Sequence, residues 1–370
     1  MTFTADDQRY MSRALELAAQ GKYSAKPNPC VGCVIVNDSD IVGEGWHKKA
    51  GEPHAEVHAL KQASAAANGS TAYVTLEPCS HHGRTPPCAD ALVKAGVSRV
   101  VIAMQDPNPL VAGKGVARLR DAGVDVFVGL LEEQARAMNK AFCHKMTTGK
   151  PYVISKVAMS LDGKTAMASG ESQWITGSAA REDVHRLRAE SDIVLTGVGT
   201  ILADDPQLTA RDGLTGFLVQ QPRIVVLDSQ LKTPLNARVF GENANTTILT
   251  CSDNEQTIQA LTAIGCIVEV IAADSKGQVD LYAVHEWLVL QNINSVMIEA
   301  GALLNGACLQ TGIVDELVIY MAPSALGSDA RGAFSMPQVS KLSDRVQLVY
   351  VNMDELGDDI KLTYNVKREK

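Results

Sequence analysis

The sequence predicts an α/β protein with two domains. Its 370 residues exceed the usual size of a single domain. Both halves alternate short apolar runs, typical of buried strands, with segments of helical periodicity. Between the halves lies Thr147-Thr148-Gly149-Lys150-Pro151, a small-residue stretch typical of a linker. We therefore expect one domain over residues 1–147 and a second over residues 151–370.

Composition indicates a globular cytoplasmic protein that acts on a small molecule. Hydrophobic residues make up 46% of the chain, enough for a core without disulfides, and eight cysteines are too sparse for a disulfide framework. We see neither a signal-peptide pattern nor an apolar run near the ~20 residues of a membrane span. The net charge of −8 argues against binding nucleic acid or an anionic membrane, so an anionic substrate requires local Arg or Lys.

The first half begins with a helix for which Thr4 is the expected N-cap and Asp7 completes a capping-box-like start. VGCVIV and IVGEGW flank the turn Asn37-Asp38-Ser39-Asp40 and predict a hairpin. A helix from about His54 to Ala67 precedes the buried strand TAYVTL. The later expected elements are helix CADALVKAG, strand SRVVIAM, helix GKGVARLRDAG, strand VDVFVG and one helix from about Glu132 to Met146.

The second half restarts the alternation of strands and helices. The expected elements are, in order, strand YVISKVAM, a helix near 178–189, strands DIVLTG, PRIVVLD and TTILTC, a helix near 255–264, strand IVEVI, a helix near 281–290, strand SVMIEAG, a helix near 303–311 and strand ELVIYMAP. This order predicts a largely parallel sheet. The final VQLVYVNMDELGDDIKLTYNVK predicts a closing antiparallel hairpin.

One set of residues carries a chemical signal: His54-Ala55-Glu56, then Glu77-Pro78-Cys79, then Cys88. One imidazole and two thiolates hold Zn²⁺ and leave a fourth position open, where a water can be activated near neutral pH. Glu56 would stay off the metal and move protons, as in zinc deaminases. Eight residues separate the two cysteines here, whereas two do so in the general deaminase motif. We predict a catalytic zinc site, with Cys88 at a helix N-terminus that favours a thiolate.

Two alternatives stay open at this point. A closed structural zinc site would need a fourth ligand, for which His58, His81 and His82 are available, but it would leave Glu56 without a task. Cys30 and Cys33 form a Cys-x-x-Cys pair, which alone suggests redox chemistry or zinc binding. Because the valines and isoleucine around them indicate a strand, we expect these two cysteines simply to pack.

The chain resembles the bifunctional deaminase-reductase family of riboflavin biosynthesis. KPNPCVGCVIV, GWHKKAGEPHAEVHAL and TLEPCSHHGRTPPC carry the resemblance in the first half, and the long cysteine spacer is the family's own variant. SKVAMSLDGKTA, GESQWITG, RAESDIVLTGVGTILADDPQLTAR, IEAGALLNGACL and VDELVIYMAPSALG carry it in the second. The resemblance implies a three-layer cytidine-deaminase-like domain followed by a dihydrofolate-reductase-like domain.

The resemblance also implies the reactions. The first domain would use Zn²⁺ to deaminate a diaminopyrimidinone bearing a phosphoribosylamino group, and the second would use NADPH to reduce the ribosyl group to ribityl. The family suggests a homo-oligomer, expected to be a dimer. Two other hypotheses are a deaminase whose second domain only binds or assembles, and a non-catalytic protein scaffolded by zinc. Binding of NADPH to a 147–370 fragment separates the first of these from the bifunctional enzyme.

The family's functional residues map onto numbered positions of this chain. In the first half Asn28 and His47 would contact the pyrimidine, Arg84 would bind the phosphate, and His82 would shape the spacer loop. The alternatives are that Asn28 is a turn residue, that His47 is a surface residue at a strand end, and that Arg84 is a solvated loop charge. In the second half the implied NADP contacts are Ala158, Trp174, Thr200, Asp204, Ser229, Gly301, Ala302, Leu303, Leu304, Asn305, Gly306 and Ala307. The implied substrate contacts are Lys156, Ser172, Arg188, Leu208, Arg211 and Glu299.

Several of these second-half assignments have ordinary structural alternatives. Gly197-Val198-Gly199 lacks the third glycine of a dinucleotide fingerprint, so it is weak support alone. The segment 301–307 would bring helix amides to the pyrophosphate, or be a simple strand-to-helix turn. Arg188 and Arg211 would supply positive charge for the phosphorylated ribose, or form surface ion pairs. Lys156 would lie near the ribose and help to open its ring.

Overall fold

Two structural units account for the chain, and the computed structural model describes residues 3–80, 86–109, 111–241, 245–337 and 339–367. The first unit comprises residues 1–150 with 216–220, and the second comprises 151–215 with 221–370. Within the described ranges no helix has the length and apolar character needed to cross a membrane.

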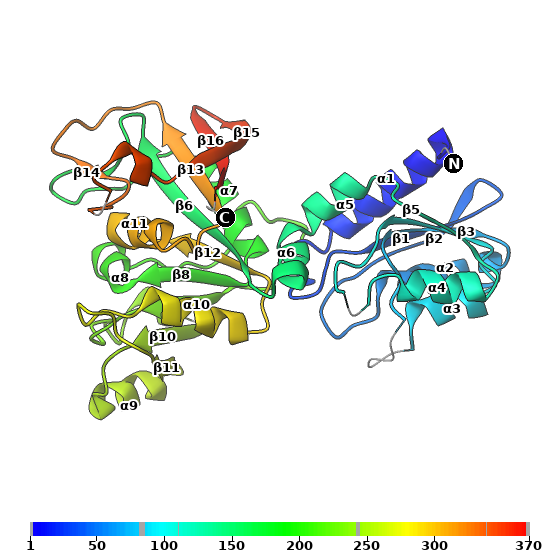
Figure 1. Ribbon diagram of the computed structural model, residues 1–370, viewed down its shortest axis with the longest axis horizontal. Helices are drawn as coiled ribbons and strands as arrows, with labels where there is room; N and C mark the ends of the chain where they lie inside the picture. The colour runs from blue at the N-terminus through cyan, green and yellow to red at the C-terminus, as the bar shows by residue number, and fades with distance from the viewer. Residues whose placement is uncertain (1–2, 81–85, 110, 242–244, 338, 368–370) are drawn as a thin grey trace. The chain divides into compact units, whose positions relative to one another are not determined.

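The first unit is built on a five-stranded sheet in the order β2-β1-β3-β4-β5 (Figure 1). Its strands are β1 (Gly32–Asn37), β2 (Asp40–Trp46), β3 (Thr71–Leu76), β4 (Arg99–Met104) and β5 (Asp125–Val128). β1 and β2 form the predicted antiparallel hairpin, and β1 is also antiparallel to β3. β3, β4 and β5 are parallel, so their carboxyl ends, and the loops that follow them, lie at the same edge of the sheet.

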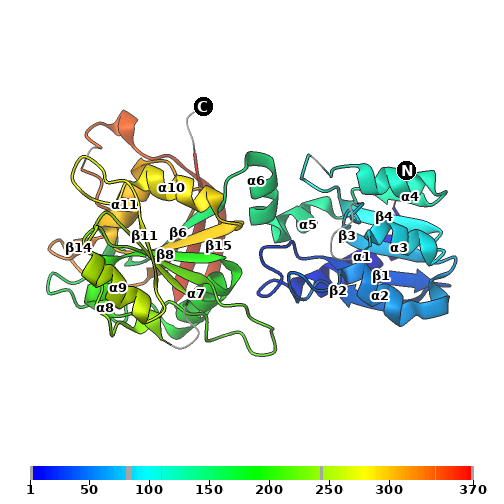
Figure 2. The ribbon, with the colours of Figure 1, turned by 90° about the horizontal axis from the view of Figure 1, so that it is seen from below.

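Helices cover both faces of this sheet and make three layers (Figures 1 and 2). The helices are α1 (Ala5–Ala19), α2 (Ala55–Ala63), α3 (Cys88–Lys94), α4 (Lys114–Asp121), α5 (Glu132–Met138) and α6 (Lys140–Thr148), with a 3₁₀ turn at Ser64–Ala67. α1 and α5 pack on one face, and α2, α3 and α4 on the other. The predicted capping box is confirmed: Thr4 Oγ1 accepts the Asp7 amide and Asp7 Oδ2 accepts the Thr4 amide.

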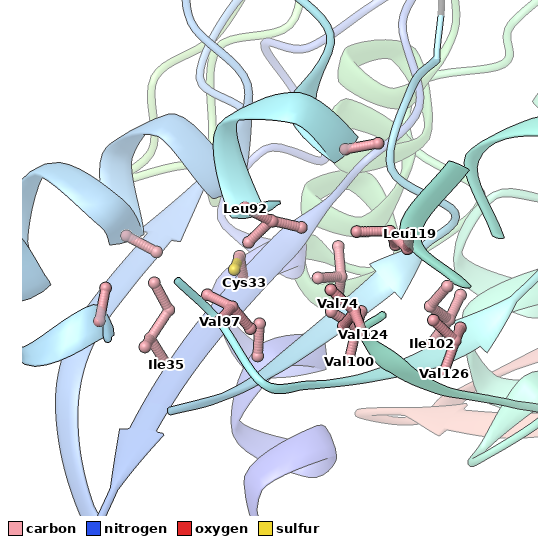
Figure 3. Close-up of a cluster of buried hydrophobic side chains, with 14 of the residues drawn as sticks. Cys33, Ile35, Val74, Leu92, Val97, Val100, Ile102, Leu119, Val124 and Val126 are labelled. Carbon is pink, nitrogen blue, oxygen red and sulfur yellow. The ribbon is translucent and has the colours of Figure 1, made fainter. Parts of the chain in front are cut away.

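The alternation of side chains along β1 explains the Cys-x-x-Cys pair. Cys33 and Ile35 point to the α2–α4 face, where Cys33 lies near Leu92 of α3 (Figure 3). Val34 and its neighbours of the same parity pack under α1. Cys33 is fully buried and Cys30 nearly so, and neither forms a disulfide. They therefore behave as small core residues.

The expectation of one helix over 132–146 is wrong, because Asn139 divides it into α5 and α6. Asn139 is buried, and its backbone leaves the helical region with φ −109° and ψ 28°. Its side-chain amide makes the two hydrogen bonds to the Cys30 backbone that a neighbouring strand would make. Oδ1 accepts from the Cys30 amide at 2.8 Å, and Nδ2 donates to the Cys30 carbonyl at 3.0 Å. The two hydrogen bonds to the buried Cys30 backbone outweigh helix continuity here.

The second unit contains a nine-stranded sheet in the order β11-β10-β9-β8-β12-β6-β13-β16-β15. Its strands are β6 (Tyr152–Ser160), β8 (Ile193–Gly197), β9 (Arg223–Leu227), β10 (Thr246–Thr250), β11 (Ile267–Val270), β12 (Ser295–Glu299), β13 (Glu316–Ala322), β15 (Leu348–Leu356) and β16 (Asp359–Val366); β7 (Lys164–Ala166) and β14 (Arg331–Gly332) form a separate pair. The strands from β11 to β13 are parallel, and β16 and β15 are antiparallel, which confirms the predicted parallel sheet and closing hairpin.

In the described part of this unit the sheet is flanked by α7 (Ser178–Glu190), α8 (Val198–Asp204), α9 (Glu255–Ala263), α10 (Leu281–Leu290) and α11 (Ala302–Gln310). α10 and α11 pack on one face, and α7, α8 and α9 on the other. The short 3₁₀ turns are Arg238–Phe240 and Leu342–Asp344. α8 was not expected from the sequence, because Gly199 is a poor helix former and Gly197-Val198-Gly199 indicated only a turn.

Candidate active sites

His54, Cys79 and Cys88 come together at the carboxyl end of the first sheet. His54 is the N-cap of α2, Cys79 follows β3, and Cys88 is the first residue of α3. His54 Nδ1 lies 3.6 Å from Cys79 Sγ and 3.3 Å from Cys88 Sγ. Tetrahedral zinc bonds of 2.3 Å to sulfur and ~2.0 Å to nitrogen would place such atoms about 3.6 Å apart. The three donor atoms therefore fit one zinc ion.

The group has three members. Among the residues that the structure describes, no other His, Cys, Asp or Glu brings a donor atom into it. His58, one suggested fourth ligand of a closed site, is not part of it, and His81 and His82 lie outside the described residues. A three-ligand set is the arrangement of catalytic zinc.

Glu56 lies two residues after His54 on the first turn of α2, and only 3% of it is exposed. Burial raises the pKa of its carboxyl, and the charge of His54 offsets only part of that rise. A carboxyl with a raised pKa both accepts and returns a proton near neutral pH more readily than an exposed one. Its position beside the cluster suits an acid–base group.

The pKa values of the two thiols are shifted in opposite directions. The pKa of Cys79 is lowered to about 4, first by the Cys88 thiol and further by His54 and the Cys88 amide, which donates to Cys79 Sγ at 3.3 Å. The pKa of Cys88 is raised, because its proton is held by Cys79 and burial opposes a second thiolate. Zinc requires both sulfurs as thiolates, so metal binding displaces a proton.

Glu77 belongs to the motif seen in the sequence, but its hydrogen bonds become visible only in the structure. It is buried, and its carboxylate accepts four backbone amides, three of them at the start of α4 and one in the loop before it. Oε1 accepts from Gly115 and Val116 at 2.8 and 3.1 Å, and Oε2 accepts from Gly113 at 3.0 Å and from Asp106, in the loop, at 3.1 Å. The negative charge thereby caps the positive end of α4. Because Glu77 precedes Pro78-Cys79, this cap fixes the segment that carries one sulfur of the cluster.

Asn28 and His47 lie beside the cluster. The ring of His47 packs edge-on against that of His54, with 5.4 Å between centroids. Burial lowers the pKa of His47, and the neutral ring donates from Nδ1 to the Pro53 carbonyl at 3.3 Å while Nε2 accepts from Asn28 Nδ2 at 3.0 Å. Asn28 Oδ1 therefore stays available as an acceptor. Arg84, expected to bind phosphate, and His82 lie outside the described residues.

In the second unit most of the expected cofactor residues follow the carboxyl ends of neighbouring parallel strands. Thr200 and Asp204 belong to α8 after β8, Ser229 follows β9, and Gly301 is the N-cap of α11 after β12. β9, β8 and β12 are adjacent in the sheet, so these positions share one edge. At that edge a Cβ on Gly197 would touch Leu304 Cδ2 at 3.4 Å, which shows how near the two turns are.

Not every residue of the 301–307 segment faces this edge. Gly301 and Leu303 are exposed, whereas Asn305 and Gly306 are buried. Asn305 accepts from Ser155 Oγ and donates to the Ala300 carbonyl, and a Cβ on Gly306 would overlap the Ser335 backbone. Asn305 and Gly306 therefore anchor α11, and the first turn of α11 is the part open to a ligand.

Other expected contacts are spread around the edge. Trp174 is 70% exposed with the Arg181 guanidinium 4.8 Å above its ring. Ser172 Oγ donates to Asp204 Oδ1 at 3.4 Å. Ala158 lies in β6 and packs against the core under α7, and Leu208 is buried with a left-handed φ of 55°.

A buried ion cluster joins three of the expected substrate residues. Glu299, at the end of β12, accepts from Arg188 Nε at 2.8 Å and Nη2 at 2.9 Å, and from Lys156 Nζ at 3.3 Å. Burial alone would raise the pKa of Glu299, but the charges of Arg188 and Lys156 more than offset it and lower the pKa below its usual range. Arg188 forms an internal ion pair rather than the surface pair considered from the sequence.

Comparisons with known proteins agree across both units. Residues 151–362 match the family model of the RibD C-terminal domain, and residues 4–104 match the cytidine and deoxycytidylate deaminase zinc-binding region. The riboflavin biosynthesis protein RibD of Escherichia coli strain K12 is 50% identical over 366 residues, which cover 96% of this chain and 98% of that protein.

Two solved structures extend this similarity to the whole fold. Acinetobacter baumannii RibD is 47% identical, with a TM-score of 0.89 and coverage of 98% of this chain and 99% of that one. A Thermotoga maritima diaminohydroxyphosphoribosylaminopyrimidine deaminase/5-amino-6-(5-phosphoribosylamino)uracil reductase is 33% identical, with a TM-score of 0.85 and the same coverage. The chain belongs to the RibD family, whose members are bifunctional deaminases and reductases of riboflavin biosynthesis.

Proposed function

We propose that residues 1–147 deaminate 2,5-diamino-6-(5-phosphoribosylamino)pyrimidin-4-one by hydrolysis. The observation that carries this proposal is the three-donor cluster of His54, Cys79 and Cys88 with the buried Glu56 beside it. When bound there, zinc supplies Lewis-acid activation of water at neutral pH. Glu56 takes a proton from that water and gives it to the departing amine. Asn28, oriented by His47, offers Oδ1 to a donor group of the pyrimidine.

A Glu56→Gln variant tests this role. The amide preserves shape and cannot move protons, so zinc content should equal that of the wild type while deamination falls about 10²–10⁴-fold. Reduction of the aminouracil product by the same preparation serves as the internal control and should persist. Deamination near the wild-type rate would refute the assignment of Glu56.

We further propose that residues 151–370 reduce the ribosyl group of 5-amino-6-(5-phosphoribosylamino)uracil to ribityl with NADPH. NADPH, when bound, supplies the hydride. The first turns of α8 and α11, at one edge of the sheet, offer unpaired amides to its phosphates. Lys156, held by Glu299, would lie by the ribose and help to open its ring, while Arg211 would bind the ribose phosphate.

Steady-state kinetics with each ligand varied separately test this division. Arg211→Ala should raise the KM for the phosphorylated substrate far more than that for NADPH. A bulky residue at Gly301 should do the reverse, because it would obstruct the approach of the pyrophosphate to the α11 amides. A rise confined to the NADPH KM in Arg211→Ala would contradict our assignment of Arg211.

We propose that the chain forms a homodimer through β15. This strand is at the end of the large sheet and is exposed over nearly its full length. It presents Val349, Tyr350, Val351 and Met353, each 43–60% exposed, and an apolar edge strand of this kind favours pairing with a second copy. Light scattering after size exclusion should give twice the chain mass of 39.5 kDa, and Tyr350→Lys should reduce it. A monomeric wild type would contradict the proposal.

A further inference from the structure

His185 is a buried residue of α7 that the proposed chemistry does not use. It lies one turn before Arg188 on the same helix, and 7% of it is exposed. Its ring reaches the loop after α8, which carries Arg211. It therefore contacts both segments from which the reductase half draws its substrate cations.

Both ring nitrogens contact the loop. Nε2 faces the Asp212 carboxylate at 3.1 Å. Nδ1 lies 3.1 Å from the Thr209 carbonyl, 3.3 Å from the Arg211 amide and 3.4 Å from Arg188 Nη1, which itself donates to the Thr209 carbonyl at 3.2 Å. We assign the ring proton to Nε2 because the Asp212 carboxylate faces it, and in that tautomer Nδ1 accepts from the Arg211 amide.

The electrostatic surroundings support the neutral form. Burial lowers the pKa of His185, and the positive charges of Arg188 and Arg211 lower it further, with Asp212 and the Thr209 carbonyl acting in the opposite direction. A neutral ring whose Nε2–H is fixed by Asp212 keeps its Nδ1 lone pair directed at the Arg211 amide.

The position of Arg211 depends on this loop. Its Nη1 donates to Gln207 Oε1 and Thr209 Oγ1 at 2.5 and 2.8 Å, and among the described residues it forms no ion pair. The guanidinium is therefore held by its own loop. The loop is held to α7 through His185, through Arg188 Nη1 at the Thr209 carbonyl and through Arg186 Nε at the Gly213 carbonyl, and of these contacts His185 is the one that reaches the Arg211 backbone.

We propose that His185 is a positioning residue of the reductase site, which holds the backbone of Arg211 so that its guanidinium meets the phosphate of the substrate. The inference rests on the proposed phosphate-binding role of Arg211. His185 touches neither substrate nor cofactor in this account; it acts through Arg211 and through Arg188 Nη1.

Two amide substitutions separate the functions of the ring nitrogens. His185→Asn places an amide oxygen near the position of Nδ1 and preserves the acceptor for the Arg211 amide. His185→Gln reaches the position of Nε2 and preserves only a donor to Asp212. Since one lost hydrogen bond of this kind corresponds to roughly a five- to tenfold effect, His185→Gln and His185→Ala should raise the substrate KM by that factor, and His185→Asn by no more than about twofold.

Dephosphorylated substrate provides the readout that a general loss of stability would not change. The KM ratio between the dephosphorylated and phosphorylated forms should fall in His185→Gln, His185→Ala and Arg211→Ala, with kcat and the NADPH KM little altered. Val184→Ala is the matched control, because it removes buried atoms from the same helix away from the loop. It should lower the melting temperature without changing the ratio.

Two results would overturn the inference in distinguishable ways. If Arg211→Ala lowers the ratio while His185→Gln and His185→Ala leave it at the wild-type value, His185 has no positioning role and the proposed function stands. If Arg211→Ala itself leaves the ratio unchanged, the phosphate assignment fails and the inference fails with it. Should His185→Ala not fold, the comparison of His185→Asn with His185→Gln still decides the question.

Discussion

Replacing Glu77 by Gln perturbs the support of the metal cluster without touching a proposed ligand. Oε1 of Glu77 accepts the two buried amides of Gly115 and Val116 at the start of α4, and Oε2 accepts the part-buried amides of the N-cap Gly113 and of Asp106 in the loop before it. A Gln side chain has only one acceptor oxygen, and its NH₂ group must face two amide donors. We therefore expect two charge-assisted hydrogen bonds to be lost outright, and the other two to become neutral.

The magnitude follows from the number of bonds lost. A hydrogen bond to a charged group contributes about 1.5–3 kcal/mol, so two lost bonds destabilise the start of α4 by about 3–6 kcal/mol. Every 1.4 kcal/mol is a factor of ten, which corresponds to about 10²–10⁴-fold faster opening of the α4 amides. Because Glu77 leads directly into Pro78-Cys79, zinc should also be lost to a chelator faster than from the wild type.

Hydrogen exchange measured by mass spectrometry on peptides that span residues 105–121 gives this local free energy directly. Glu44→Gln is the matched control, since Glu44 is 27% exposed in an ion pair with Arg13, and such pairs contribute at most about 1 kcal/mol. If the α4 amides of Glu77→Gln exchanged within tenfold of the wild-type rate, the reasoning about this cap would be wrong.

Three further predictions concern charge and metal. Elemental analysis should show that Cys79→Ala and Cys88→Ala both lose zinc, and full retention of zinc in both variants would contradict the ligand set. The zinc affinity of the wild type should fall as pH falls, because binding must displace the proton that the raised pKa of Cys88 retains. Arg99 lowers the pKa of Asp7, so the stabilisation is present above the ordinary carboxyl pKa of 3.8 and is lost as pH falls below it; urea midpoints should therefore decline less steeply with acid in Asp7→Asn. Glu299→Gln leaves two buried cations without their anion and should lower the free energy of urea unfolding by about 3–5 kcal/mol; a free energy equal to that of the wild type would contradict the importance of the cluster.

The sequence predicted those features whose causes are local. The capping box at Thr4 and Asp7, the hairpin about Asn37–Asp40, and Cys88 as the first residue of a helix each depend on residues within one or two turns of each other. The meeting of His54 with two distant cysteines was also predicted, because a strand and two helix starts of known order bring them to one edge of a parallel sheet.

The features that the sequence did not predict depend on hydrogen bonds between distant segments. Asn139 breaks a helix to satisfy Cys30, 109 positions earlier in the chain. Glu77 caps a helix 36 to 39 positions later, and His185 holds a loop 24 to 26 positions later. Helical periodicity and local capping patterns contain no information about such partners, so a buried Asn, Glu or His looks like any other polar residue until the fold is known.

Arg188 shows that counting charges in the sequence does not reveal which cation is free to bind a phosphate. An acidic chain needs placed cations for a phosphate, and Arg188 and Arg211 looked equivalent in sequence. In the structure Arg188 directs Nε and Nη2 to Glu299 and Nη1 to Thr209, so each nitrogen of its guanidinium already donates. Its charge lowers the pKa of the buried Glu299 carboxyl next to Lys156, and we therefore propose that Arg188 supports this ion cluster rather than serving as a free phosphate ligand. In our proposal, binding of the substrate phosphate therefore depends on Arg211, and the affinity for that phosphate depends on the contacts that hold the Arg211 loop in place.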